Sequence, residues 1–181
     1  MRIIAGKFKK AKLISVKSRN TRPTTDFLKE VIFSVLGDCE DKHTLDLYAG
    51  SGSLGLEALS RGAKTAVFVD MSENSIKAIK ANLQKLNCAE ICRIHKKKVA
   101  PYLKFESGNF DFIFVDPPYN KDLINPTVEL IFNNHLLTEN GKIIIERSKN
   151  ETLKTEWSCY KIYDKDYGDS AVTLLANKIK E

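Results

Sequence analysis

Apolar residues follow two patterns along the chain, one typical of helices and one of buried strands. Residues that recur every three or four positions share one face of a helix, whereas short continuous runs are typical of strands covered on both faces. The first pattern predicts longer helices at 27–36, 54–61 and 72–86. The second predicts strands at 44–49, 66–69, 91–94, 112–115, 143–145, 160–163 and 171–175.

Most of these strands and helices alternate, which favours an α/β fold with a doubly wound, mostly parallel sheet of seven strands. The last two runs flank the turn 167–170 and predict a terminal antiparallel hairpin. Asn125 followed by Pro126 predicts a cap and a first helical position for one further helix. The first helix is predicted to bury an apolar stripe made of Phe27, Leu28, Val31, Ile32, Val35 and Leu36.

The chain has 181 residues, of which 43% are hydrophobic, and this length suits a single domain. We expect residues 26–181 to form that domain and residues 1–25 to add a short β extension to it. The longest apolar runs have about five residues, far fewer than the roughly 20 that cross a bilayer. The opening residues lack an apolar signal core, so we expect a soluble cytosolic protein without a membrane contact.

Four cysteines show no C-x-x-C pair, and three histidines show no ligand spacing. Free buried thiols are the expected state of the cysteines, at Cys39, Cys88, Cys92 and Cys159. We expect no metal.

Positive charge is concentrated at the start of the chain. The net charge is +6, and residues 1–25 hold eight Lys and Arg with no acid, so they carry all of the excess. Clustered cations gain affinity for a polyanion by releasing its condensed counterions, although a solubilising surface strand has the same composition. The candidate RNA-binding residues are Arg2, Lys7, Lys9, Lys10, Lys12 and Arg19.

A glycine-rich motif directly follows the strand at 44–49. Gly50, Gly52 and Gly55 form G-x-G-x-x-G before a helix, and Asp70 ends the next strand 20 residues after Gly50. Such glycines let a ligand approach the backbone, and the acid can accept hydrogen bonds from both ribose hydroxyls. This context predicts a site for a cofactor of adenosine type, with a plain structural turn as the alternative.

A second motif, Asp116-Pro117-Pro118-Tyr119, directly follows the strand at 112–115. Each proline fixes its own φ and keeps the preceding residue extended, so polar groups here are held in one geometry. A strand-ending turn with an incidental acid is the simpler explanation for this motif alone. Together with the glycine loop, it predicts chemistry at the carboxyl edge of the sheet, where open α/β sheets bind ligands.

These two motifs fit S-adenosylmethionine (SAM) better than a nicotinamide cofactor, because the residues after 104 leave little room for a substrate domain. The motif at 116–119 also suggests the acceptor. The Asp116 carboxylate and the Pro117 carbonyl can accept both protons of an exocyclic amino group and turn its lone pair toward the methyl donor, while Tyr119 stacks on the base. The base must be unstacked to enter such a site.

At these residues the chain resembles the RsmD-type 16S ribosomal RNA guanine-N2 methyltransferases, and the resemblance runs nearly from end to end. It rests on MRIIAG at 1–6, TRPTTD at 21–26, DLYAGSGSLGLEALSRGA at 46–63, DPPY at 116–119 and YG at 167–168. The glycine loop and DPPY occur in many amino-directed methyltransferases, whereas the other segments are more specific.

The resemblance implies a Rossmann-like SAM-dependent methyltransferase that modifies a guanine 2-amino group in 16S rRNA. It implies the small ribosomal subunit or a late assembly intermediate as partner, and we expect a monomer. Asp116, Pro117, Pro118 and Tyr119 would be the catalytic residues. The cofactor-binding residues would be Asp46, Ala49, Gly50, Ser51, Gly52, Gly55, Asp70, Met71, Arg22 and Thr24. Many methyltransferases recognise the adenine amino group with an Asp or Asn at the end of the third strand, but this chain has Lys96-Lys97-Lys98 there. Which group would recognise the adenine is therefore left open.

Three other functions are compatible with parts of the sequence. A DNA adenine-N6 methyltransferase would need a target-recognition domain, for which the chain has no room. A protein glutamine methyltransferase usually has Asn-Pro-Pro-Tyr and an N-terminal helical domain, whereas this chain has Asp116 in that motif and a basic N-terminal segment. A nonenzymatic RNA-binding protein with this fold is the alternative from another class, and the intact pocket sequence disfavours it.

Overall fold

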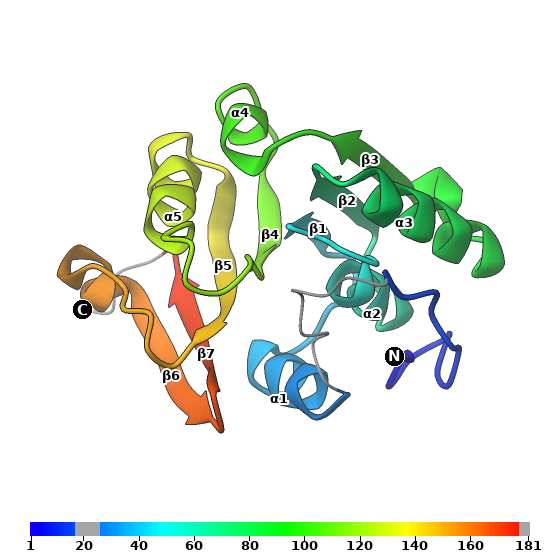
Figure 1. Cartoon of the computed structure of the whole chain (residues 1–181), viewed down its shortest axis with the longest axis horizontal. Helices are drawn as coiled ribbons and strands as arrows, with labels where there is room; N and C mark the ends of the chain where they lie inside the picture. Colours follow the sequence, from blue (N-terminus) through cyan, green and yellow to red (C-terminus); the bar gives the residue numbers. More distant parts are fainter. Residues whose placement is uncertain (17–25, 178–181) are drawn as a thin grey trace.

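The computed structural model describes residues 1–16 and 26–177, and seven strands within them form one sheet in the order β3-β2-β1-β4-β5-β7-β6 (Figure 1). The elements are α1 (Asp26–Leu36), β1 (His43–Leu47), α2 (Ser53–Ser60), β2 (Thr65–Asp70), α3 (Glu73–Lys85), η1 (Ala89–Ile91), β3 (Cys92–Lys96), α4 (Val99–Leu103), β4 (Phe110–Val115), α5 (Ile124–Asn133), β5 (Leu137–Ser148), η2 (Thr155–Tyr160), β6 (Lys161–Tyr167) and β7 (Ser170–Ala176).

Strands β1 to β5 are parallel, and the terminal hairpin adds β7 antiparallel to β5 and β6 antiparallel to β7. The predicted doubly wound sheet with its closing hairpin is therefore confirmed. The parallel strands β1 and β4 are neighbours at the centre of the sheet. From β1 the chain continues to β2 and β3 on one side, and from β4 it continues to β5, β6 and β7 on the other, so the strand order reverses between β1 and β4. Ligands of open α/β sheets bind at such a reversal, outside the carboxyl ends of the strands.

Helices cover both faces of the sheet, because side chains of a buried strand alternate between two cores. On β4, Phe112 and Phe114 pack in the core that contains α1, α2 and α3. Ile113 and Val115 of the same strand pack in the core that contains α4 and α5. The sheet is thus held rigidly from both sides, and the loops at its carboxyl edge are left for chemistry.

Three local predictions were wrong. Phe27 is 58% exposed, because α1 buries the face with Leu28, Ile32 and Leu36 and leaves the start of the predicted stripe outside. Asn125 does not cap α5, which begins at Ile124; its side chain instead bonds the loop after β5. The cysteines are all free, but Cys159 is exposed rather than buried.

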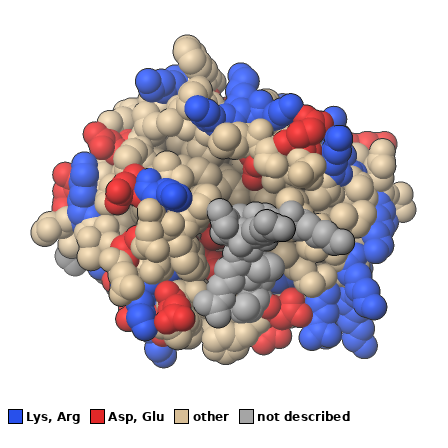
Figure 2. All heavy atoms as spheres, in the orientation of Figure 1, with Lys and Arg blue, Asp and Glu red and all other residues tan. Residues whose placement is uncertain are grey.

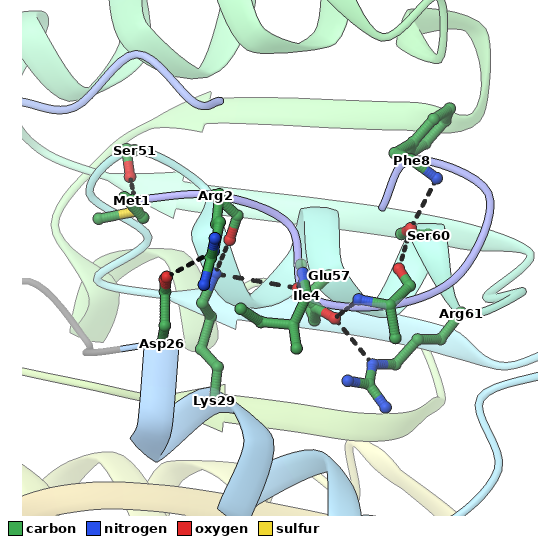
Figure 3. Close-up of polar contacts among 12 residues, drawn as sticks. Met1, Arg2, Ile4, Phe8, Asp26, Lys29, Ser51, Glu57, Ser60 and Arg61 are labelled. Atoms are coloured by element: carbon green, nitrogen blue, oxygen red, sulfur yellow. Dashed lines mark hydrogen bonds and ion pairs between the residues drawn. The ribbon is translucent and has the colours of Figure 1, made fainter. Parts of the chain in front are cut away.

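The first 16 residues form an arm that we define here as residues 1–16. Where the sequence predicted a short β extension, Arg2 and Lys12 form an isolated antiparallel bridge. The arm lies on α2, where Glu57 accepts hydrogen bonds from the backbone N–H groups of Ile4 at 2.8 Å and Ala5 at 3.0 Å (Figure 3). Gly6 has φ of +78° and passes so close to α2 that a Cβ would stand 1.7 Å from the Ser60 carbonyl oxygen. Only glycine fits there.

Charged groups are buried beneath the arm. Glu57 and Lys29 have no exposed side-chain surface and lie 3.8 Å apart, and Arg61 contacts Glu57 at 2.9 Å. The Lys29 ammonium also donates to the Arg2 carbonyl (Figure 3). Burial lowers the pKa of Lys29, and the nearby Glu57 carboxylate partly opposes that shift. A buried charge without a partner is costly, so this network fixes the arm to α1 and α2.

Candidate active site

The two predicted motifs meet at one edge of the sheet. Leu47 at the end of β1 is the register partner of Val69 in β2 and of Val115 in β4. The glycine loop, Asp70 and the segment 116–119 follow these three residues, so they emerge side by side at the carboxyl edge. The spatial arrangement expected from the sequence is therefore present.

The glycine loop is a tight turn between β1 and α2. Its entry is Tyr48, a non-glycine residue with φ of +58°, a conformation that costs energy and is common at functional sites. The Ala49 N–H donates to the Val69 carbonyl, and the Gly52 N–H donates to the Ala49 carbonyl at 2.7 Å. Gly52 has φ of +80° and is the N-cap residue of α2. The loop therefore has one defined shape at the mouth of the site.

Asp70 is fixed by backbone groups on both sides. Its Oδ2 accepts from the Gly50 N–H and its Oδ1 from the Ser72 N–H, each at 2.8 Å. A carboxylate has about four lone-pair positions, so two remain for hydroxyl donors. The next residue, Met71, leaves 63% of its side chain exposed at the same edge. An oriented acid beside an exposed apolar side chain suits a ribose that carries a flat base.

Asp46 lies beneath the loop rather than at its surface. The side chain is 1% exposed, and Oδ2 accepts from the Gly55 N–H at 2.9 Å. Burial raises the pKa of Asp46 to about 8, against the lowering effect of the Gly55 hydrogen bond. An added Cβ on Gly55 would stand 2.5 Å from the Phe68 ring. Asp46 and Gly55 thus support the loop from inside the protein.

The arm reaches the glycine loop, which the sequence did not predict. Ser51 donates a hydrogen bond to the Met1 sulfur at 3.2 Å. Asn82 of α3 accepts from the Ile14 N–H and donates to the Ser51 carbonyl, at 2.8 and 3.0 Å. All three hydrogen bonds join residues far apart in the sequence, and no local pattern signals them.

The segment 116–119 forms the other wall. Asp116 and Tyr119 are half-buried, Pro117 is buried and Pro118 is exposed. The Tyr119 hydroxyl donates to Glu146 at 3.2 Å and shares a hydrogen bond with Ser170 at 2.8 Å. Burial and the Glu146 carboxylate raise the pKa of Tyr119, so the phenol stays protonated. The Tyr119 ring is therefore held at its far end.

Glu146 and Ser170 are residues of the site that the sequence analysis missed. Both are buried, at 4% and 3% exposure, and they come from β5 and β7. Glu146 follows the apolar run Ile143–Ile145, just as Asp70 follows Val69 and Asp116 follows Val115. An acid directly after a buried strand is a signal that could have found Glu146.

The predicted basic residues separate into two groups. Arg2, Lys7, Lys9, Lys10 and Lys12 are exposed on the arm, and Figure 2 shows basic side chains gathered over it at the lower right. Arg19, Arg22 and Thr24 lie outside the described residues. At the edge of the sheet, Lys96 is the register partner of Asp70 and forms an ion pair with Glu73.

The residues at the edge fit SAM. An added Cβ on Gly50 would meet only the Tyr48 carbonyl oxygen, at 4.0 Å, so the loop is open on that side. Asp70 offers lone pairs to a ribose, and Met71 offers an apolar surface. Within residues 1–16 and 26–177, no cluster of His, Cys, Asp or Glu could hold a metal ion, and no helix could span a bilayer.

A Rossmann-like sheet with this glycine loop, this acid and this proline corner defines the class of SAM-dependent methyltransferases. The chain belongs to the family described as "Conserved hypothetical protein 95", whose model matches residues 1–176, and this is the RsmD-type family that the motifs resembled.

Known proteins that resemble the chain agree with this family. "Putative rRNA methyltransferase YlbH" of Bacillus subtilis is 39% identical over 84% of this chain and 85% of its own length. "Ribosomal RNA small subunit methyltransferase D" of Haemophilus influenzae is 34% identical over 98% and 94%. The solved structure "Putative methyltransferase yhhF from Escherichia coli" is 32% identical, with a TM-score of 0.85 and 99% of both chains covered.

Proposed function

We propose that this protein transfers a methyl group from SAM to the exocyclic N2 amino group of a guanine in 16S rRNA of the small ribosomal subunit. The observation that carries the proposal is the register of β1 with β2 and β4, which brings the glycine loop, Asp70 and Asp116 to one edge. The names of the relatives from B. subtilis and H. influenzae support a ribosomal RNA substrate.

The cofactor would lie across the glycine loop. Asp70 would accept hydrogen bonds from the ribose hydroxyls, and Met71 would pack on the adenine. The backbone from Ala49 to Gly52 would border the methionine half of the cofactor. Bound SAM supplies a methyl group on a positively charged sulfur, and the rest of the cofactor leaves as a neutral thioether once the methyl group is transferred. Asp46 would act indirectly, by holding the loop through Gly55.

The guanine would lie against the proline corner. Its amino lone pair is delocalised into the ring, so the amine is a poor nucleophile until its protons are held. The Asp116 carboxylate and the Pro117 carbonyl would accept these protons and aim the lone pair at the methyl carbon, and Asp116 would receive the proton that the amine loses. Fixed polar groups of this kind are worth several kcal/mol, on the order of 3.

Tyr119 would form the platform under the base. Its hydroxyl is engaged by Glu146 and Ser170, so the ring cannot turn away from the corner. A neutral phenol also avoids placing a second negative charge beside Asp116. Stacking on an aromatic ring is worth about 1–3 kcal/mol per base and compensates for unstacking the target.

The experiment uses small subunits from cells that lack this protein. Purified protein and isotope-labelled SAM are added, and the 16S rRNA is digested and mapped by mass spectrometry. We expect one methyl group per subunit, on N2 of a guanine that is unmodified in the cells without the protein.

A methyl group on another atom or on a ribosomal protein would contradict the assignment of the acceptor. No transfer at all, together with no heat of SAM binding in calorimetry, would favour a nonenzymatic RNA-binding protein.

A further inference from the structure

An aromatic pair, made of the exposed Phe27 and the half-buried Tyr167, lies beside the candidate active site. Phe27 at the start of α1 and Tyr167 at the end of β6 have ring centroids 5.8 Å apart, with planes at 72°. Phe27 keeps 58% of its surface exposed although it belongs to an amphipathic helix that buries its neighbours. Single exposed apolar residues are normal, but one that is fixed edge-on by a second ring is a preformed flat surface.

Contacts connect this pair to the proline corner. Tyr167 is the register partner of Ser170 in the hairpin of β6 and β7. Ser170 in turn holds the Tyr119 hydroxyl at 2.8 Å. The aromatic pair is therefore linked, through Tyr167 and its register partner Ser170, to Tyr119, whose ring would stack on the target base. Figure 1 shows α1 next to the hairpin of β6 and β7, in agreement with the ring contact.

The local charge favours stacking over phosphate binding. The Lys165 ammonium lies 5.8 Å from the centre of the Tyr167 ring. Nearby Asp164 pairs with Arg147 and Lys161, and Asp169 pairs with Lys149. Three of these four cations are thus paired with an acid. A ligand that gains from this surface must do so mainly through an aromatic face.

We propose that Phe27, supported edge-on by Tyr167, stacks an unpaired nucleobase that flanks the target nucleotide in the RNA substrate. This inference rests on the proposed function, because it needs an RNA substrate that enters the corner. A base that leaves its helix also unstacks its neighbour, and RNA-binding proteins receive such bases on aromatic side chains. Phe27 would hold the flanking base while Tyr119 holds the target.

The test measures binding of a fluorescein-labelled single-stranded RNA of twelve nucleotides with one central guanine. Matched RNAs carry an abasic residue on the 5′ or the 3′ side of that guanine. The proteins are wild type, Phe27→Ala, Phe27→Trp and the control Phe105→Ala, which changes an 86% exposed phenylalanine on the loop after α4.

We expect Phe27→Ala to weaken binding of the intact RNA about tenfold and Phe27→Trp to restore it. On one of the two abasic RNAs, wild type and Phe27→Ala should bind equally, because the stacked base is absent. The salt dependence should stay unchanged, since stacking releases no counterions. Phe105→Ala should bind as wild type does on all three RNAs.

The proposal is overturned if Phe27→Ala binds the intact RNA as Phe105→Ala does. It is also overturned if Phe27→Ala loses the same factor on both abasic RNAs as on the intact one, which would indicate a packing role or a protein partner. Methyl transfer by wild type is measured separately on small subunits. Its absence would remove the proposed reaction, whereas normal transfer with no effect of Phe27 would remove only the stacking site.

Discussion

The chemistry proposed here depends on how firmly single residues are held. Asp70 and Asp46 each accept backbone hydrogen bonds from the glycine loop, and Tyr119 is held by Glu146 and Ser170. A carboxylate or ring that is fixed before substrate binds needs no reorganisation during the reaction. Two of these acids do different work, because Asp70 is at the surface of the site and Asp46 is buried under it.

At Asp116, replacement by Asn tests the orienting role. The amide keeps the shape of the side chain but loses the negative charge that would accept the amine protons. We expect turnover to fall about 100- to 1,000-fold, as for the loss of one fixed polar group in other sites, with little change in SAM affinity. Turnover on small subunits and calorimetry with SAM provide the two measurements.

The matched control is Asp111→Asn at the amino end of the same strand, where Asp111 bonds the His43 N–H far from the site. Turnover that drops equally in both variants would indicate a general disturbance of β4 rather than a role in orientation.

At Asp46, a pH dependence of stability is expected. The carboxyl group changes from its ordinary pKa of 3.8 to about 8 in the folded protein, because burial penalises the charge. The folded state therefore binds the proton more tightly, and the stability that Asp46 contributes below about pH 4 is lost as the pH rises through 8. Urea unfolding from pH 5 to 8 should show wild type losing up to about 1.4 kcal/mol per pH unit relative to Asp46→Asn.

Comparing the two proteins at each pH cancels the titration of all other groups. Parallel stability curves over this range would show that Asp46 does not hold its proton in the folded protein.

Among single residues, those that follow apolar runs could be predicted from the sequence. Asp70 is the last residue of β2 and Asp116 directly follows β4, and the neighbours of both strands in the sheet were implied by the alternation of elements. Glu146 carried the same signal and was missed, and the exposure of Phe27 could not be predicted because its helical spacing matches the buried stripe. Which side of an amphipathic helix turns inward is decided by the sheet.

Among elements, α2 shows where a local pattern stops being informative. All eight of its residues are buried, including Glu57 and Ser60, because the arm covers the face that would otherwise meet water. In the sequence Glu57 has the place of a solvent-facing acid in an amphipathic helix. Its partners Ile4 and Lys29 come from other segments, and only the folded chain brings them together.

Breaking this buried network should destabilise the whole domain. Glu57→Gln removes the negative charge that Lys29 and Arg61 face, and turns an acceptor of a backbone N–H into a donor. Removing one partner of a buried pair costs about 3–5 kcal/mol, and we expect a loss of that size in urea unfolding.

The control is Glu73→Gln, which breaks an ion pair with Lys96 that is exposed to solvent. Exposed pairs contribute little, so this variant should unfold as wild type does. A Glu57→Gln protein as stable as this control would mean that the arm is held by its apolar contacts alone.

At the scale of the whole molecule, the cationic arm lies next to the candidate active site. The arm holds five of the eight Lys and Arg of residues 1–25 and no acid, and Ser51 and Asn82 connect it to the glycine loop. A substrate that binds the arm would therefore lie next to the cofactor site rather than far from it. The sequence predicted a cationic segment and a site, but not the contact between them. Hydrogen bonds between residues more than 50 positions apart leave no local pattern in the sequence.

This arrangement predicts how RNA binding responds to salt. Each phosphate contact that a lysine makes releases condensed counterions, and its loss reduces the slope of log affinity against log salt by about 0.7 to 0.9. Replacing Lys9, Lys10 and Lys12 by Gln should thus weaken binding of small-subunit rRNA and flatten the slope by roughly 2.

The control is the matched loss of three charges at Lys149, Lys154 and Lys161, all of which are in ion pairs on the side of β5 and β6. Its slope should equal that of wild type, as should the slope of Phe27→Ala. If the arm variant kept the wild-type slope while the control lost it, the RNA would approach over the hairpin, and the arm would only brace the glycine loop.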